Sequence, residues 1–184
     1  SFGRNPDLGT AGFEDVWPLG GVFPGHDAVD AQTLVMVSTS NEDGAGTLTG
    51  ALTVRIRGLD AAFFPLTETL TLTGTTPAIT TASFRTITNV QVMSAGSVRS
   101  NVGLITGYQS VTTANILTAI PIGYNRTQQA IQTVPANHLG YLISWYAGMS
   151  KKQAAAGEAR LLISETFDQP FAVLGSTSIS SASS

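Results

Sequence analysis

The strongest constraint on the fold is a two-residue alternation in residues 52–57 and 66–73. Apolar and polar residues alternate in the first segment; in the second, threonine alternates with leucine, and Glu68 takes one apolar position. Successive side chains of a strand point to opposite faces, so this period indicates strands with one buried and one exposed face. We predict an antiparallel hairpin of these two segments, with the chain turning at residues 58–60.

Further segments carry the strand signal of β-branched and aromatic residues between turn residues. They are residues 31–40, 84–96, 102–108, 128–135, 138–148, 159–167 and 171–175. Residues 115–123 fit either a strand or a short helical turn, and residues 151–159 are predicted to form a loop. Many short strands with few candidate helices predict an all-β fold, an antiparallel β-sandwich of jelly-roll type.

The densest part of the core is predicted in residues 138–148. Strand alternation there places one set of large side chains on a single face: Leu139, Tyr141, Ile143, Trp145 and Ala147. Tyr141 and Trp145 are therefore interpreted as core residues, whereas Tyr124 and Tyr146 are the candidates for exposed aromatic contacts.

Residues 1–30 are predicted to form an extended, irregular arm. Pro6, Pro18, Pro24 and several glycines interrupt both helical and strand periodicity. The arm nevertheless contains four aromatic residues that need a surface to bury against, namely Phe2, Phe13, Trp17 and Phe23. Two interpretations stay open, an arm folded onto its own domain and an arm anchored on a neighbouring subunit. The predicted domains are the arm 1–30, a β-sandwich 31–175 and a flexible Ser-rich tail 176–184.

Charge is scarce, which excludes several classes of protein. Only 11% of the residues are charged and the net charge is −3, which argues against binding to nucleic acid through phosphates. The chain has no cysteine, so disulfides and thiolate metal sites are excluded. No apolar run reaches the length of a membrane span, and residues 1–10 do not resemble a signal peptide.

The charges are also unevenly distributed. Between Arg99 and Lys151 the single formal charge is Arg126. A soluble monomer of this size normally carries mixed charges on every face. The uncharged stretch therefore indicates either a sheet buried on both faces or a surface that another subunit covers.

Catalytic motifs are not recognisable, and we expect no enzyme, no cofactor and no metal site. A hydrolase triad would have to use His26 or His138, and neither lies in a known motif context. Residues 41–44 imitate a calcium loop only in part, and His26 with Asp27 and Asp30, like Glu14 with Asp15, reads as ordinary turn chemistry. The carboxylates available for a glycosidase pair follow no spacing rule: Glu42, Asp43, Glu68, Glu158, Glu165 and Asp168. The triplet at residues 125–127 matches a glycosylation site by chance.

Three segments carry a recurring sequence pattern. Residues 52–105 contain the succession G-L-D, T-E-T-L-T-L-T-G-T, T-A-S-F-R-T-I and A-G-S followed by N-V-G-L-I. Residues 6–21 (PDLGTAGFEDVWPLGG) and 127–147 (TQQAIQTVPANHLGYLISWYA) match further parts of that pattern. Together they cover most of residues 5–147, and they resemble structural proteins of tailed bacteriophages.

The resemblance implies a non-enzymatic protein of the virion surface. We expect a capsid-surface decoration, cement or fibre-anchoring subunit that binds the major capsid protein or neighbouring virion subunits through its arm. A homo-oligomer, preferably a trimer, is expected, with no nucleic acid or membrane as partner. Two alternatives stay open: a tail component such as an adaptor, tube or fibre-base protein, and a receptor- or glycan-binding module displayed on the particle.

Overall fold

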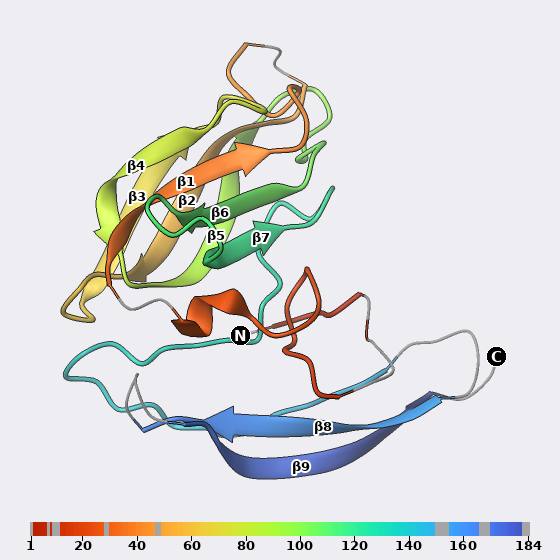
Figure 1. Ribbon diagram of the computed structural model, residues 1–184. Coiled ribbons are helices and arrows are strands. Elements are labelled where there is room, and N and C mark those ends of the chain that lie inside the picture. Colours follow the sequence, from red (N-terminus) through yellow and green to blue (C-terminus); the bar gives the residue numbers. More distant parts are fainter. Residues whose placement is uncertain are drawn as a thin grey trace. The chain divides into compact units, whose positions relative to one another are not determined.

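The computed structural model describes residues 2–6, 8, 12–27, 30–46, 49–149, 155–165 and 170–181 (Figure 1). Its contacts divide the chain into two compact units, Ser1–Leu139 and Gly140–Ser184. The sequence predicts no boundary at this point, since it places the whole of residues 31–175 in one domain.

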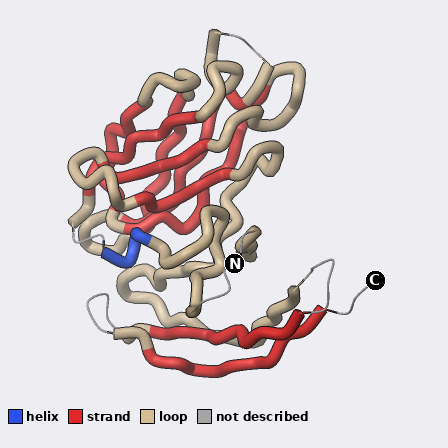
Figure 2. The backbone as a smooth tube through the Cα atoms, turned by 45° about the vertical axis from the view of Figure 1, so that its right-hand side comes forward, coloured by secondary structure: helices blue, strands red, loops and turns tan. Residues whose placement is uncertain are grey.

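The described part of the chain is all-β, as predicted (Figure 2), and every pairing between its named strands is antiparallel. The first unit contains a 3₁₀ helix η1 (Pro24–Asp27) and strands β1 (Gln32–Ser38), β2 (Ala51–Leu59), β3 (Pro65–Thr71), β4 (Ala78–Phe84), β5 (Thr86–Ala95), β6 (Ile105–Gln109) and β7 (Ile116–Ile120). They form a four-stranded sheet β4-β1-β6-β7 and a three-stranded sheet β3-β2-β5. The second unit contains the hairpin of β8 (Ala155–Ile163) and β9 (Ala172–Ser181).

The β2–β3 hairpin confirms the predicted alternation. Val54 pairs with Leu70 and Ile56 with Glu68 on the inner face, where both β2 residues are fully buried. The threonines of β3 are all exposed on the outer face. The predicted turn at residues 58–60 comes too early, because β2 continues to Leu59. The turn starts at Asp60, whose Oδ1 accepts hydrogen bonds from the amides of Ala62 and Phe64.

Strand β4 was missed by the sequence analysis because its apolar pattern is inverted. Its inward positions include the small or polar residues Ala78 and Thr80, while Ile79 is exposed. The buried Thr80 hydroxyl accepts a hydrogen bond from the amide of Leu34 and donates one to the carbonyl of Ala82. The Thr80 side chain takes the place of part of the backbone hydrogen bonding where the β1–β4 register shifts. The pairing of β4 thus depends on a buried threonine, which a pattern of hydrophobicity does not reveal.

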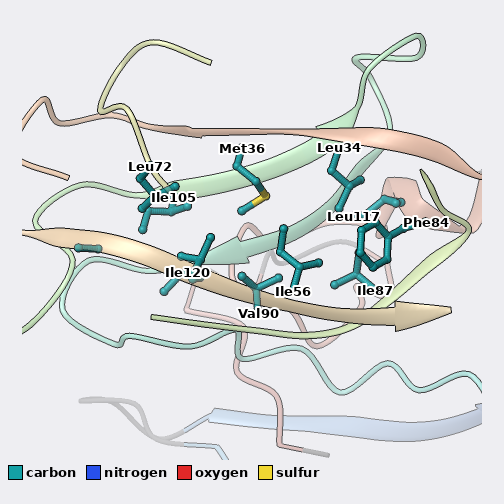
Figure 3. Close-up of a cluster of buried hydrophobic side chains, with 12 residues drawn as sticks. Leu34, Met36, Ile56, Leu72, Phe84, Ile87, Val90, Ile105, Leu117 and Ile120 are labelled. Carbon is teal, nitrogen blue, oxygen red and sulfur yellow. The ribbon is translucent and has the colours of Figure 1, made fainter. Parts of the chain in front are cut away.

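Buried side chains from both sheets of the first unit form one hydrophobic cluster in the described structure (Figure 3). Leu34 and Met36 of β1 point toward Ile56 of β2 and Val90 of β5 in the close-up. The fully buried Phe84 is the largest side chain of the cluster. Residues 115–123, left open by the sequence, contain strand β7, which adds Leu117 and Ile120 to this core.

Residues 128–135 and 138–148 are not strands, contrary to the prediction. Part of the first segment instead holds the N-terminal residues. The amide of Arg4 donates to the carbonyl of Gln128, and the amide of Ala130 donates to the carbonyl of Val16, at 3.0 and 2.9 Å. These bonds fold the predicted arm onto its own unit.

The second unit is a hairpin covered in part by the segment that precedes it. The Trp145 ring lies against β9, with its indole nitrogen 3.8 Å from where a Cβ of Gly175 would stand. Strand β9 extends to Ser181 and thus includes residues predicted as a flexible tail. Of the predicted loop 151–159, residues 151–154 lie outside the described part, and the rest begins β8.

The hydrogen bonds of Glu68 explain why this charged residue occupies the apolar face of the hairpin. Its two carboxylate oxygens accept hydrogen bonds from the amides of Thr81 and Ala82, at 2.9 and 2.8 Å. The half-buried side chain therefore joins β3, at the edge of one sheet, to β4, at the edge of the other.

Replacing Glu68 with glutamine is expected to destabilise the first unit by about 1–2 kcal/mol, because the new NH₂ group would face an amide that needs an acceptor. Urea unfolding followed by far-ultraviolet circular dichroism measures this change. The exposed Glu165→Gln serves as the matched control, with an expected change below about 0.5 kcal/mol. Equal midpoints for both variants would contradict the proposed bond between the sheets.

Candidate functional site

The predicted densest core is the most exposed apolar segment of the protein. Leu139, at the end of the first unit, is 81% exposed, and Tyr141 and Ile143, in the second, are 82% and 95% exposed. The pattern of the side chains is that of a strand, but the segment has no strand partner in the described structure. The prediction is wrong because alternation identifies side chains that share a face without identifying what covers that face.

The hairpin of the second unit carries more exposed apolar side chains. Together with the preceding segment they make up what we call the apolar surface of the second unit, which includes both faces of the hairpin because neighbouring strand residues point to opposite faces: Tyr141, Leu142, Ile143, Tyr146, Leu162, Ile163, Phe171, Val173 and Leu174. Isolated two-stranded hairpins are marginally stable in water. In the described structure each strand pairs only with the other, so both have a free edge.

The four aromatic residues of the predicted arm divide into two pairs. Trp17 and Phe23 are 3% and 6% exposed, and their rings meet edge to face at a centroid distance of 5.2 Å. The Trp17 indole also donates to the carbonyl of Gly20 at 2.7 Å. Both residues are thus core residues of the first unit, which corrects their prediction as intersubunit anchors. Phe2 and Phe13 remain exposed.

Both predicted exposed aromatic residues are accessible. Tyr146 is 92% exposed and belongs to the apolar surface of the second unit. Tyr124, in the first unit, is partly covered by Arg4, whose guanidinium lies 5.6 Å from the ring centroid and whose Nη1 donates to the phenolic oxygen. Tyr141 is exposed as well and Trp145 half-buried, so their assignment to the core is wrong.

Asp43, a candidate for metal or acid chemistry, is fully buried and serves the fold. Its carboxylate accepts four hydrogen bonds, from the Ser38 hydroxyl and the amides of Ala51, Val102 and Gly103, at 2.7–2.9 Å. These donors come from three separate stretches of chain. With both oxygens occupied by protein donors, the carboxylate joins loops at one end of the first unit.

A pair of asparagines continues this polar network. The buried Asn101 and the half-buried Asn125 form reciprocal hydrogen bonds: the backbone amide of each residue donates to the side-chain oxygen of the other, at 3.0 Å. The Asn125 side-chain nitrogen donates to the carbonyl of Arg99. The asparagine side chain of the glycosylation-like triplet 125–127 is therefore part of this hydrogen-bond network.

The other chemistry-bearing candidates do not converge on a common centre. His138 is exposed, and its Nδ1 lies 2.8 Å from the carbonyl of Ala136. The hydrogen bond from Arg160 lowers the pKa of the exposed Glu158 carboxyl. Asp168 and the side chain of His26 lie outside the described part. Among the described residues, no three His, Cys, Asp or Glu side chains gather closely enough to hold a metal ion.

A polar hollow of about 350 Å³ lies beside the outer face of the three-stranded sheet. Its lining comes from β2, β5, the segment after residue 125 and the N-terminal segment: Phe2, Arg57, Thr88, Asn89, Gln91, Arg126, Thr127, Gln129 and Gln132. The sequence pattern placed Arg55 and Arg57 on one strand face. The pattern could not predict that Arg126 lies beside them, because Arg126 reaches β5 through an isolated bridge with Gln91.

Comparison with known proteins supplies no relative. No protein-family model, no curated protein and no solved structure matches this chain. Within the described residues, none of the helical structure is long and apolar enough to cross a membrane.

Proposed function

We propose that this protein is a non-enzymatic structural subunit of a tailed-phage particle, a capsid-surface decoration, cement or fibre-anchoring protein. In this proposal the two sheets of the first unit form a jelly-roll-like β-sandwich, and the second unit is the element of assembly. The sequence resemblance of residues 5–147 supports the phage assignment. The observation that carries the structural role is the apolar surface of the second unit.

The number of exposed apolar side chains in the second unit favours an interface. The nine side chains are 44–95% exposed and lie on both faces of the hairpin. Exposed apolar side chains gathered on a small unit typically mark an interaction surface.

A further copy of the chain is the partner that this surface suits best. Residues 140–184 contain three basic and three acidic residues, so identical units do not repel one another through net charge. The hairpin offers one free edge on β8 and one on β9, so three copies can close a ring by pairing unlike edges. A homotrimer would in this way remove the exposed strand edges.

In this proposal, surfaces outside the ring bind the major capsid protein or other virion subunits. Of the predicted arm anchors, only Phe2 and Phe13 are exposed, because Trp17 and Phe23 are buried in their own unit. Attachment through the arm would therefore use its first residues.

Light scattering after size exclusion tests the assembly, and we expect a trimer at micromolar concentration. Quantitative mass spectrometry of purified particles of the encoding phage tests the location. Hundreds of copies per particle are expected for a decoration protein, whereas six, twelve or a few dozen copies at one vertex would indicate the alternative, a tail component. A stable monomer, or absence of the chain from the particle, would contradict the proposal.

A further inference from the structure

The outer face of the three-stranded sheet gathers positive charge in a chain that has little of it. Arg55 and Arg57 alternate with the buried residues of β2, opposite Gln91 and Asn89 of β5. Arg126 joins the same face through its bridge with Gln91. The three strands are described throughout, and their single carboxylate, Glu68, faces the interior.

Within the described part of the chain, no carboxylate neutralises Arg57 or Arg126. The nearby Arg55 Nε is buried without a hydrogen-bond partner, and its Nη2 contacts the Gln91 side-chain oxygen at a long 3.4 Å. The face therefore has spare capacity to donate hydrogen bonds to an anion.

The hollow next to these arginines is lined mostly by amide and hydroxyl side chains, those of Thr88, Asn89, Gln91, Thr127, Gln129 and Gln132. Amide groups offer both donors and acceptors, which is what the hydroxyl groups of a sugar require. The exposed Phe2 ring adds an apolar wall, and the volume of about 350 Å³ lies within the range of small-ligand sites.

We propose that this hollow binds a carboxylated sugar unit of an acidic glycan. Arg57 and Arg126 bind the carboxylate, for which the planar guanidinium is geometrically suited. The amide side chains bind the ring hydroxyls, and Phe2 packs against the apolar side of the ring. The amide lining, which offers donors and acceptors to ring hydroxyls, favours a sugar over an acidic peptide or a polyphosphate backbone.

The test measures binding of the full chain to polygalacturonate by isothermal titration calorimetry, with neutral dextran as the uncharged comparison. We expect binding to polygalacturonate and none to dextran. Arg57→Gln and Arg126→Gln should each weaken the affinity about tenfold, as expected for loss of a charge-assisted contact. Arg160→Gln, which removes an exposed arginine from β8, is the charge-matched control and should retain the affinity.

Two further probes make the test decisive. Equal or tighter binding of poly-glutamate would assign the hollow to an acidic peptide, and equal binding of a DNA oligonucleotide would assign it to a general anion surface; either result overturns the proposal. Unchanged affinity of both arginine variants with unchanged melting temperatures would do the same. The result is separable from the proposed assembly, because a chain that fails to trimerise still carries the complete hollow in its first unit.

Discussion

Asp43→Ala is expected to destabilise the first unit by about 4 kcal/mol. The substitution removes the acceptor of four hydrogen bonds and leaves the buried amides of Ala51 and Gly103, together with that of Val102, without a partner. Each such orphaned group costs about 1–3 kcal/mol. The small alanine side chain also leaves a gap among the polar groups of these loops.

Guanidinium chloride unfolding, followed through the fluorescence of the buried Trp17 in a Trp145→Phe background, measures this loss. The chain has two tryptophans, so this background reports the first unit alone. Asp60→Ala is the matched control: the same substitution removes two hydrogen bonds in an exposed turn, and about 1 kcal/mol is expected. If Asp43→Ala lowers the free energy of unfolding no more than Asp60→Ala does, the buried carboxylate does not hold the loops together as described above.

The second large effect is expected at the apolar surface of the second unit. The triple variant Tyr141→Ser, Ile143→Ser and Tyr146→Ser should convert the proposed trimer into a monomer, with at least about a hundredfold weaker association. These three side chains are 82–95% exposed, so their removal eliminates interface area without opening a cavity in the subunit. Truncation of central aromatic residues commonly costs 2 kcal/mol or more each at an interface.

Sedimentation velocity over a concentration series measures the association, and circular dichroism checks that the subunit stays folded. The control replaces three exposed apolar residues of the first unit, Val98, Val111 and Ile122, with serine. This control should assemble like the parent chain. A triple variant of the second unit that still sediments as a trimer would rule out this surface as the interface.

The sequence predicted the parts of the fold in which hydrophobicity and strand period coincide. The β2–β3 hairpin was found because its leucines, valine and isoleucine alternate with threonine and arginine. Strand β4 was not found, since its pairing depends on the buried Thr80 hydroxyl and its isoleucine points outward. A pattern of hydrophobicity carries no information about polar groups that are buried because they are hydrogen-bonded.

The uncharged stretch after Arg99 shows how one signal can have two causes. Its first part lies in β6 and β7, where the residues are mostly buried. Its later part, residues 138–148, is exposed. The buried sheet accounts for the first part, whereas cover of the later part by another subunit stays a prediction, since the absence of charge does not show which molecule excludes water from a residue.

The sequence predicted which residues of the candidate site share a face of one strand, but it did not predict which distant segments come together. Alternation placed Arg55 and Arg57 on a common face, but joining them to Arg126 requires the chain to return to β5 from a distant segment. Likewise, the aromatic residues of the N-terminal segment signalled burial correctly for Trp17 and Phe23. Composition could not tell whether their own unit or another subunit provides that burial.

The bond between Glu68 and β4 also bears on how the protein chooses its partners. Both edge strands that it joins belong to the first unit, and two amides on one of them are already occupied. A sheet edge that is already occupied cannot recruit a strand from another molecule. In the proposed assembly a single glutamate therefore closes part of the β4 edge, so that this stretch of β4 does not compete with the free edges of β8 and β9 for a strand of another molecule.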